Sequence, residues 1–286
     1  MPDPGWLFQP SVFPWFAGAV GLCVGSFLNV VIHRLPRMME LAWRADCAEL
    51  QGQPAPEAGR YNLFIPASRC PGCDRRIRAI ENVPVASWLA LRAKCPGCGM
   101  RISARYPLVE LLGAASGAWA AAHFGPTAAA LGAMLFLWCT IALAFIDQAT
   151  GYLPDDLTLP LLWAGLLFNL GGTFVPLHEA VAGAAGGYLV LWLIFWAFKF
   201  ATGKDGMGYG DFKMLAAVGA FLGWKMLPLV ILLSSVVGLA FGVLQMLGAR
   251  RGWDAAFRFH FGPYLAIAGV VALFWGQRIL AWYLGG

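Results

Sequence analysis

Two short cysteine turns carry the clearest pattern of metal-binding residues in the sequence. Cys70 and Cys73 are separated by Pro-Gly, and Cys95 and Cys98 repeat this arrangement after an interval of 21 residues. Four thiolates on two tight turns suit a tetrahedral Zn²⁺ ion, and the spacing is that of a zinc ribbon. A redox dithiol is the alternative, but one such pair needs no twin and no thioredoxin-like pattern surrounds either turn. We therefore predict a structural zinc site at Cys70, Cys73, Cys95 and Cys98.

Acidic residues beside long apolar segments form the second candidate site. Asp147 ends an apolar run, and Asp211 follows the glycine-rich segment Gly206-Met-Gly-Tyr-Gly210. An ionisable group at membrane depth costs roughly 2.5–3.5 kcal/mol on insertion scales, which makes it a functional candidate. Two close carboxylates cannot both ionise easily, so one can deprotonate water while the other polarises a peptide carbonyl. We predict that Asp147 and Asp211 are the catalytic pair of an aspartyl protease and titrate as one unit.

Each acid also has a purely structural interpretation. Asp211 suits a helix N-cap, because Asp is a favoured cap and glycine-rich loops often precede helices. Asp147 suits a polar helix end, although an acid is unfavourable at a helix C-terminus. Asp155 and Asp156 are capping candidates for the next helix. The glycines before Asp211 resemble a nucleotide-binding loop only weakly, since no strand precedes them.

The composition indicates which elements must position these residues. Of 286 residues, 59% are hydrophobic and 12% are charged, against roughly 25% charged in a typical soluble domain. Because about 20 helical residues cross the hydrocarbon core, we predict an all-α polytopic membrane protein with about eight transmembrane helices. The first is expected to be a retained span, because no basic n-region or small-residue cleavage site of a signal peptide is evident. The predicted spans are 13–33, 107–123, 127–146, 157–172, 180–199, 211–223, 226–248 and 262–283.

The distribution of Lys and Arg predicts the orientation. Basic residues flank the large polar loop and fill the loops after the fifth and seventh spans, whereas the other side has only Lys225 and Arg278. The positive-inside rule then places the large loop in the cytoplasm and both termini in the periplasm. The net charge of +5 therefore reflects topology, and no nucleic-acid partner is expected. Asp147 and Asp211, 64 residues apart, fall at the same membrane depth.

We expect three functional parts along the chain. Residues 1–33 form the first transmembrane helix, 34–106 a cytoplasmic zinc-ribbon-like domain, and 107–286 a seven-helix protease domain. The zinc ion is expected to fold a small domain that cannot otherwise bury enough core.

Five further residues are given structural roles. Cys23 and Cys139 lie within predicted spans and are expected to pack. Asn29 and Glu110 are expected to form hydrogen bonds between helices. Lys213 is interpreted as an interfacial anchor rather than a residue that docks substrate or biases the charge of the aspartate pair.

Several motifs in a fixed order add a resemblance that covers nearly the whole chain. They are Gly25-Ser-Phe-Leu-Asn29-Val-Val-Ile-His-Arg34-Leu-Pro36, the paired Cys-Pro-Gly-Cys turns, Glu81-Asn82-Val-Pro84 with Ser87-Trp88, Ile102-Ser-Ala-Arg105-Tyr-Pro107, Leu153-Pro-Asp155, Gly208-Tyr-Gly210-Asp211-Phe-Lys213 and Phe261-Gly-Pro263-Tyr. In these motifs the chain resembles the type IV prepilin peptidases, which are bifunctional leader peptidases and N-methyltransferases of bacterial pilus and type II secretion systems.

The resemblance implies that Asp147 and Asp211 are the catalytic aspartates, the latter in a GxGD motif. It implies prepilin and pseudopilin substrates, cleaved after a glycine where a basic cytoplasmic leader meets a hydrophobic segment in the inner membrane. It also implies methyl transfer from S-adenosylmethionine to the new N-terminal residue. Residues 34–106 show no standard methyl-donor fold, so the resemblance alone carries this activity and identifies no donor-binding residues.

Other classes of function remain open. A signal-peptide-peptidase-like protease without methyl transfer would carry a Pro-Ala-Leu motif, which this chain lacks. A proton-coupled transporter would use the acids as a relay, but such proteins often have repeated halves, and none is found here. A zinc-anchored scaffold would leave Asp147 and Asp211 without a role.

Overall fold

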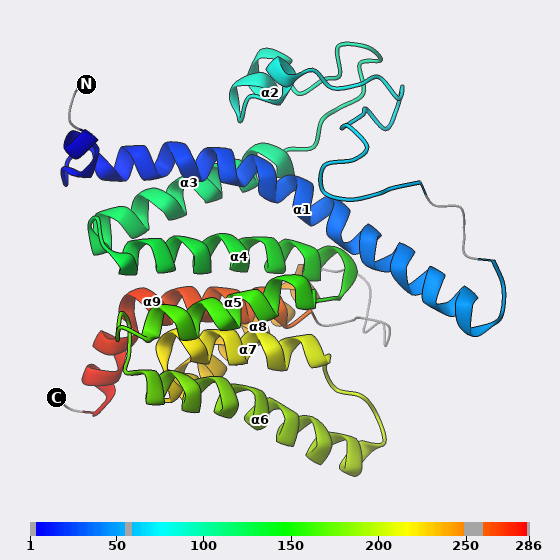
Figure 1. Cartoon of the computed structure of the whole chain (residues 1–286). Helices are drawn as coiled ribbons and strands as arrows, with labels where there is room; N and C mark the ends of the chain where they lie inside the picture. The colour runs from blue at the N-terminus through cyan, green and yellow to red at the C-terminus, as the bar shows by residue number, and fades with distance from the viewer. Residues whose placement is uncertain (1–3, 55–58, 249–259, 285–286) are drawn as a thin grey trace. The chain divides into compact units, whose positions relative to one another are not determined.

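The structure is a computed structural model that describes residues 4–54, 59–248 and 260–284. Contacts divide the chain into two compact units, Met1–Pro126 and Thr127–Gly286. Within the described residues the secondary structure is helical, with two isolated β-bridges and no strands (Figure 1). The prediction of an all-α protein is therefore confirmed.

The first unit is built on two long helices. The helix α1 (Phe13–Leu50) follows the short 3-10 helix η1 (Pro4–Phe8), and α3 (Arg105–Phe124) packs along it. Among the described residues between them, the helices are short: η2 (Ala79–Asn82) and α2 (Ala86–Ala90). A Cβ atom on Gly25 would lie 2.6 Å from the Cα of Glu110. The backbones of α1 and α3 thus touch where glycine permits it, as is common between membrane helices.

The first helix continues beyond the predicted membrane span of residues 13–33, and the bounds of that span stay a prediction. The helix α1 continues to Leu50 and contains Pro36. Residues 34–50 are rich in Leu, Met, Glu, Ala and Arg, which are good helix formers. The change from apolar to charged residues at Arg34 marks the end of the apolar stretch, not the end of the helix.

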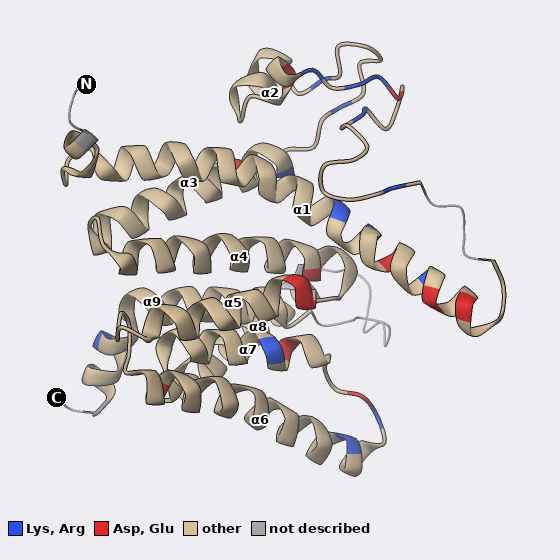
Figure 2. Cartoon of the chain, viewed as in Figure 1, with Lys and Arg blue, Asp and Glu red and all other residues tan. Residues whose placement is uncertain are grey.

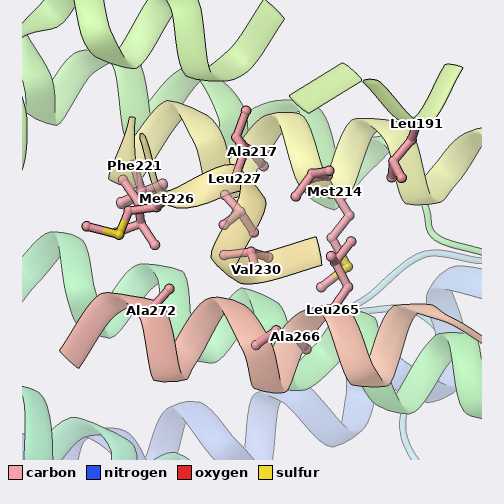
Figure 3. Packing of buried hydrophobic residues seen from close by; sticks show 14 of the residues in the cluster. Leu191, Met214, Ala217, Phe221, Met226, Leu227, Val230, Leu265, Ala266 and Ala272 are labelled. Atoms are coloured by element: carbon pink, nitrogen blue, oxygen red, sulfur yellow. The ribbon is translucent and has the colours of Figure 1, made fainter. Parts of the chain in front are cut away.

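The second unit is a bundle in which α7 is the most buried helix. Nearly every residue of α7 from Asp211 to Leu222 is buried, and α7 contacts α5, α6 and α9. Figure 3 shows Met214, Ala217 and Phe221 of α7 packed among apolar side chains of the neighbouring helices. A helix that is apolar on all faces belongs in a core. The helices of this unit are α4 (Ala128–Thr150), α5 (Asp155–Asn169), α6 (Leu177–Thr202), α7 (Tyr209–Leu222), η3 (Trp224–Met226), α8 (Leu227–Gly248) and α9 (Gly262–Leu284).

Two contacts fix α7 within this unit. Gly187 of α6 lies against Leu215 of α7, where an added Cβ would stand 2.7 Å from the Leu215 carbonyl oxygen. At the far end of α7, the buried side-chain amide of Asn169 donates to the carbonyl oxygens of Ala220 (2.8 Å) and Phe221 (3.1 Å). These contacts hold α7 against α6 and α5 along its length.

Among the residues that the structure describes, five helical segments are long and apolar enough to cross a membrane, which indicates a multi-pass membrane protein. They are Phe13–Leu50, Ala128–Thr150, Leu177–Thr202, Trp224–Leu244 and Gly262–Tyr283. A helix also covers each of the other three predicted spans, and apart from α1 the helices match the predicted bounds within four residues. The 14 residues of α7 reach only about 21 Å at a rise of 1.5 Å each, so the count of eight spans stays a prediction.

Candidate active site and metal-binding cluster

The predicted catalytic acids lie at one end of the second unit, where α4 and α6 end and α5, α7 and α9 begin. We call this the aspartate end of the bundle. Most charged residues of these helices are found there, whereas the middle of the bundle has few (Figure 2). The sequence predicted such a grouping because acids and bases are costly along an apolar helix.

Asp147 lies in the last turn of α4 and is buried. Its backbone carbonyl accepts a hydrogen bond of 2.7 Å from the N–H of Gly151, which ends the helix in the left-handed conformation that glycine favours. Its side-chain Oδ2 accepts a hydrogen bond of 3.0 Å from the N–H of Gly262, the first residue of α9. Asp147 is therefore held by a backbone group 115 residues away.

The space at this hydrogen bond admits no side chain on Gly262. An added Cβ would lie 2.7 Å from Asp147 Oδ2 and 3.0 Å from Asp147 Cγ. His260 also acts electrostatically on Asp147, and its Nε2 lies 3.4 Å from where a Cβ on Gly151 would stand. The start of α9 and the end of α4 thus form one tightly fitted contact around the Asp147 carboxylate.

Asp211 is the third residue of α7 and is also buried. The N-cap of α7 is Gly208, so the interpretation of Asp211 as the cap is wrong. An added Cβ on Gly210 would lie 2.7 Å from the Cβ of Leu153, which places the start of α7 against the segment that follows α4. The glycine-rich sequence before Asp211 is explained by this close approach.

Aromatic side chains also pack around the first turn of α7. Phe212 is fully buried, and its ring lies 5.8 Å from that of Phe195 on α6 and 5.2 Å from that of Tyr209. Rings at such separations add attraction beyond the area they bury. This packing anchors the first turn of α7, which carries Asp211.

The two carboxylates are near enough to interact electrostatically with each other. The α4–α5 connection contains Leu153, against which Gly210 packs, so the acids are tied together through both backbone and packing. Two buried carboxylates that interact electrostatically do not both ionise easily. Such an arrangement can activate water and protonate a leaving group without a covalent intermediate.

Asp155 and Lys213 join α5 to α7 beside this site. Lys213 Nζ lies 2.7 and 2.6 Å from the two carboxylate oxygens of Asp155. The N-cap position of α5 is Pro154, and the predicted capping by Asp155 or Asp156 does not occur, although both lie in the first turn. The role of Lys213 as an interfacial anchor is not tested by this ion pair and stays a prediction.

The four predicted metal-binding cysteines gather in the first unit. Their sulfur atoms all lie within 4.8 Å of one another. The Sγ atoms of Cys70 and Cys98 are 3.7 Å apart, and those of Cys73 and Cys95 are 4.0 Å apart. Sulfurs bound to one tetrahedral Zn²⁺ ion at about 2.3 Å would be about 3.8 Å apart. The group can therefore hold a metal ion.

The two cysteine turns share one backbone hydrogen-bonding pattern. The N–H of Cys70 donates to the carbonyl oxygen of Arg75 at 2.9 Å, and the carbonyl oxygen of Cys70 accepts from the N–H of Asp74 at 2.8 Å. In the second turn, the N–H of Cys95 donates to the carbonyl oxygen of Met100, and the carbonyl oxygen of Cys95 accepts from the N–H of Gly99, each at 2.8 Å. Asp74 and Gly99, each directly after the second cysteine of its turn, have φ of 54° and 73°. Each turn therefore aims its two sulfurs by local backbone geometry alone.

Nearby groups favour thiolate at one of these sulfurs. Hydrogen bonds from the backbone N–H groups of Gly97 and Cys98 lower the pKa of the Cys95 thiol to about 6. Thiolate is the form that binds metal. Between the turns, the Arg75 guanidinium lies 2.8 Å from both carboxylate oxygens of Glu81, and this hydrogen bond, followed by that from the Arg78 N–H, lowers the pKa of Glu81.

The contacts of the polar residues and cysteines within the predicted spans can be compared with their predicted structural roles. Asn29 Nδ2 donates to Tyr106 O at 3.0 Å, which confirms a hydrogen bond between α1 and α3. Glu110 accepts at 2.7 Å from the N–H of Val85, the N-cap residue of α2, so its bond joins α3 to the start of a short helix. Cys139 packs against the apolar core, whereas Cys23 is exposed.

Sequence reasoning assigned no role to Gly262 or His260. The only signal was the Phe261-Gly-Pro263-Tyr motif at a helix start, and nothing in it identifies a partner. A hydrogen bond from a backbone N–H leaves no trace in residue type, so only the folded chain shows that Gly262 meets Asp147.

Comparison with known proteins identifies relatives along the whole chain. Residues 19–124 match the bacterial peptidase A24 N-terminal domain, and residues 134–243 match the type IV leader peptidase family. A relative from Aeromonas salmonicida, named prepilin leader peptidase/N-methyltransferase, is 54% identical over 282 residues, covering 98% of this chain and 94% of the relative. Proteins of the same name from Stutzerimonas stutzeri and Pseudomonas aeruginosa are 53% and 51% identical, each covering 96% of this chain and 95% of the relative. No solved structure matches. The chain thus belongs to the type IV leader peptidase family, together with the prepilin leader peptidase/N-methyltransferases.

Proposed function

We propose that this protein removes the leader peptide from prepilins and pseudopilins and then methylates the new N-terminus, with Asp147 and Asp211 as the catalytic pair of the peptidase. The membership of the family and the names of its relatives support both activities. The observation that carries the residue assignment is the pair of buried, electrostatically interacting carboxylates at the aspartate end of the bundle.

The pair acts on the scissile peptide through water. The ionised carboxylate removes a proton from a water molecule, whose oxygen attacks the peptide carbonyl. The protonated carboxylate donates a hydrogen bond to that carbonyl oxygen, and a proton then passes to the leaving amine. The hydrogen bond from Gly262 holds Asp147 in one direction throughout, which supports a reaction that needs the acids in fixed positions.

The cytoplasmic face is the proposed place of cleavage. Lys199 and Lys213 lie at the same end of the bundle as the two acids, and basic residues beside membrane spans favour the cytoplasmic side. A substrate with a basic leader outside the membrane and an apolar segment within it would present its junction at this level. Cleavage after a glycine at the junction follows from the family resemblance.

The cysteine cluster is proposed to hold one structural Zn²⁺ ion. Cys70, Cys73, Cys95 and Cys98 would supply four thiolate ligands to one ion, so the metal would have no open position for substrate. The zinc ion would stabilise the folded residues that lie between α1 and α3. The methyl group would come from S-adenosylmethionine.

Single substitutions of the acids test the catalytic assignment. Purified protein in detergent is incubated with a prepilin, and cleavage is followed for the wild type, Asp147→Asn and Asp211→Asn. Each variant should lose more than about a thousandfold in rate, because the acids work as a unit. Asp156→Asn is the matched control, since Asp156 is an exposed acid at the same end of the bundle. Near wild-type cleavage by either active-site variant would show that the assigned pair is wrong.

The order of the two activities is tested with a labelled methyl donor. Label should appear on the mature N-terminus only after cleavage, because the amine that accepts the methyl group does not exist in the precursor. Label on uncleaved prepilin, or equal labelling with the Asp211→Asn variant, would contradict this order.

A further inference from the structure

One arginine lies against the cysteine cluster without being among its four sulfur ligands. Arg75 follows the first cysteine turn by two residues, and its side chain is only partly exposed. Its guanidinium interacts electrostatically with the side chain of Cys95, which belongs to the other turn. Arg75 therefore reaches from the turn that precedes it in the chain to the opposite turn.

The second cysteine turn receives the Arg75 side chain at Gly97. A Cβ added to Gly97 would lie 3.2 Å from Arg75 Cδ, 3.3 Å from Arg75 Nε and 3.4 Å from Cys73 Sγ. A residue with a side chain at position 97 would therefore press on the arginine and on a sulfur of the first turn at once. The Arg75 side chain thus packs across the second turn beside the cluster.

One donor of this side chain has no acceptor in the protein. Arg75 Nε is buried and makes no hydrogen bond within the part of the chain that the structure describes. A buried donor without an acceptor is rare and requires an explanation. Four thiolates around one Zn²⁺ ion would carry an excess of negative charge, and sulfur accepts hydrogen bonds. A negatively charged cluster would explain a donor that is otherwise unused.

Glu81 holds the guanidinium in place. Arg75 Nη2 donates to both carboxylate oxygens of Glu81 at 2.8 Å. The carboxylate is fixed in turn, because its Oε2 also accepts from the N–H of Arg78 at 3.0 Å and the N–H of Glu81 donates to the Arg78 carbonyl oxygen at 2.9 Å. The side chains of Arg75 and Glu81 are 32% and 14% exposed, so solvent screens this pair less than an exposed one.

The Arg69 side chain shows by contrast why Arg75 is singled out. Arg69 Nη1 pairs with Asp74 Oδ2 at 2.6 Å, and these side chains are 53% and 79% exposed. Exposed ion pairs of this kind contribute little and are weakened by salt. Arg75 is therefore the better-held positive charge beside the sulfurs.

We propose that Arg75, held by Glu81, is a positioning residue of the metal site that offsets the negative charge of the four thiolates and thereby tightens Zn²⁺ binding. This inference rests on the proposed zinc site. It also gives a role to the motif Glu81-Asn82-Val-Pro84, which neither the aspartate pair nor the four ligands use. Partners of this kind, outside the ligand set, typically change metal affinity by about 10- to 100-fold.

The zinc affinity of the full-length protein in detergent tests this role. The Kd for zinc is measured by competition with a chelator of known zinc affinity. Arg75→Gln should weaken zinc binding by about 10- to 100-fold, and Arg75→Lys should weaken it less, because the positive charge remains. Arg76→Gln is the matched control, since it removes the same charge from an exposed arginine one residue away.

Glu81→Gln should act through the arginine. It should weaken zinc binding less than Arg75→Gln does, and the double variant should bind zinc no more weakly than Arg75→Gln alone, because the two residues form one unit. Fully additive losses would contradict the role of Glu81 as the residue that holds Arg75.

A spectroscopic readout separates the effect of charge from an effect on folding. Co²⁺ bound in place of zinc gives an absorption band from charge transfer between thiolate and metal, and its energy depends on the charge around the sulfurs. Arg75→Gln should move this band to longer wavelength, because the thiolate electrons lose a stabilising cation. Arg76→Gln should leave the band where it is in the wild type.

The possible outcomes distinguish the role of Arg75 from the zinc site itself. Equal zinc affinity of Arg75→Gln and Arg76→Gln, or an unmoved cobalt band in Arg75→Gln, would overturn the role of Arg75. If Arg75→Gln does not fold, Arg75→Lys decides, since zinc affinity within about tenfold of the wild type supports the proposal and complete loss of zinc contradicts it. If the wild type holds no zinc, the proposed zinc site fails and this inference fails with it.

Discussion

The cysteine cluster and the aspartate end are positioned by different kinds of structure. The four sulfurs come from two turns that close on themselves through backbone hydrogen bonds to residues at most five positions away. The two carboxylates come from helices whose ends are fixed by other helices, with Asp147 held by a residue 115 positions away. Two of the cysteines are exposed, whereas both aspartates are buried.

The difference concerns what each site needs in order to work. A metal ion supplies most of the free energy that organises a tetrahedral cysteine site, so short turns suffice to offer the ligands. A pair of carboxylates has no such ion and tends to move apart by repulsion. Only a rigid bundle can keep the acids together, which is why glycines at close helix contacts surround that site.

Replacing Cys70 and Cys73 with Ser should have the largest effect. Apparent binding free energies of structural zinc are about 10–16 kcal/mol, so metal content should fall from about one ion per chain to nearly none. Elemental analysis measures this, and limited proteolysis should show new cleavage within residues 60–104. Cys47→Ser is the control, because Cys47 is an exposed cysteine outside the cluster. Retention of the full metal content by the double variant would rule out the four-cysteine site.

Gly262→Ala should have the next largest effect, on prepilin cleavage. The added methyl group would stand 2.7 Å from Asp147 Oδ2, and displacement of a reacting group by about 1 Å can cost roughly 100-fold in rate. The loss should appear in kcat more than in KM. Gly171→Ala is the matched control, since a Cβ there meets nothing within 4 Å. Equal rates for the two variants would show that this contact does not position Asp147.

Asn169→Ala should lower stability without touching either site. Asn169 is buried and joins α5 to Ala220 and Phe221 of α7, and its side-chain oxygen accepts from the N–H groups of Phe174 and Val175. Leaving such groups without partners should cost about 1–3 kcal/mol. Thermal unfolding in detergent measures the change, with Ser235→Ala as the control at an exposed serine. An unchanged Tm would mean that α7 does not depend on this anchor.

Lys213→Met should have the smallest effect on stability. The ion pair with Asp155 is partly exposed, with side-chain exposures of 27% and 53%, and such pairs contribute about 0–1 kcal/mol. The melting temperature should therefore change little in detergent. A decrease as large as that of Asn169→Ala would show that this ion pair, rather than packing, holds α7 to α5.

The sequence by itself determined the helical class, the positions of nearly all long helices and the composition of the cysteine cluster. These properties depend on local pattern. A run of apolar residues forms a helix wherever it lies, and a Cys-Pro-Gly-Cys turn converges two sulfurs without help from distant residues. The continuation of α1 beyond its apolar stretch was not predicted, since hydropathy reports the solvent around a helix and not the end of its hydrogen bonding.

Only the tertiary structure decided what surrounds the two acids. The sequence indicated that Asp147 and Asp211 lie at the same membrane depth. It did not indicate that the N–H of Gly262 donates to Asp147, or that Gly210, the residue before Asp211, packs against Leu153. It showed two motifs of the first unit without showing that Asn29 and Arg105 line one cavity. Such contacts join residues that are far apart in the chain through backbone atoms and close packing of surfaces. The type of a single residue does not reveal which distant residue it will contact.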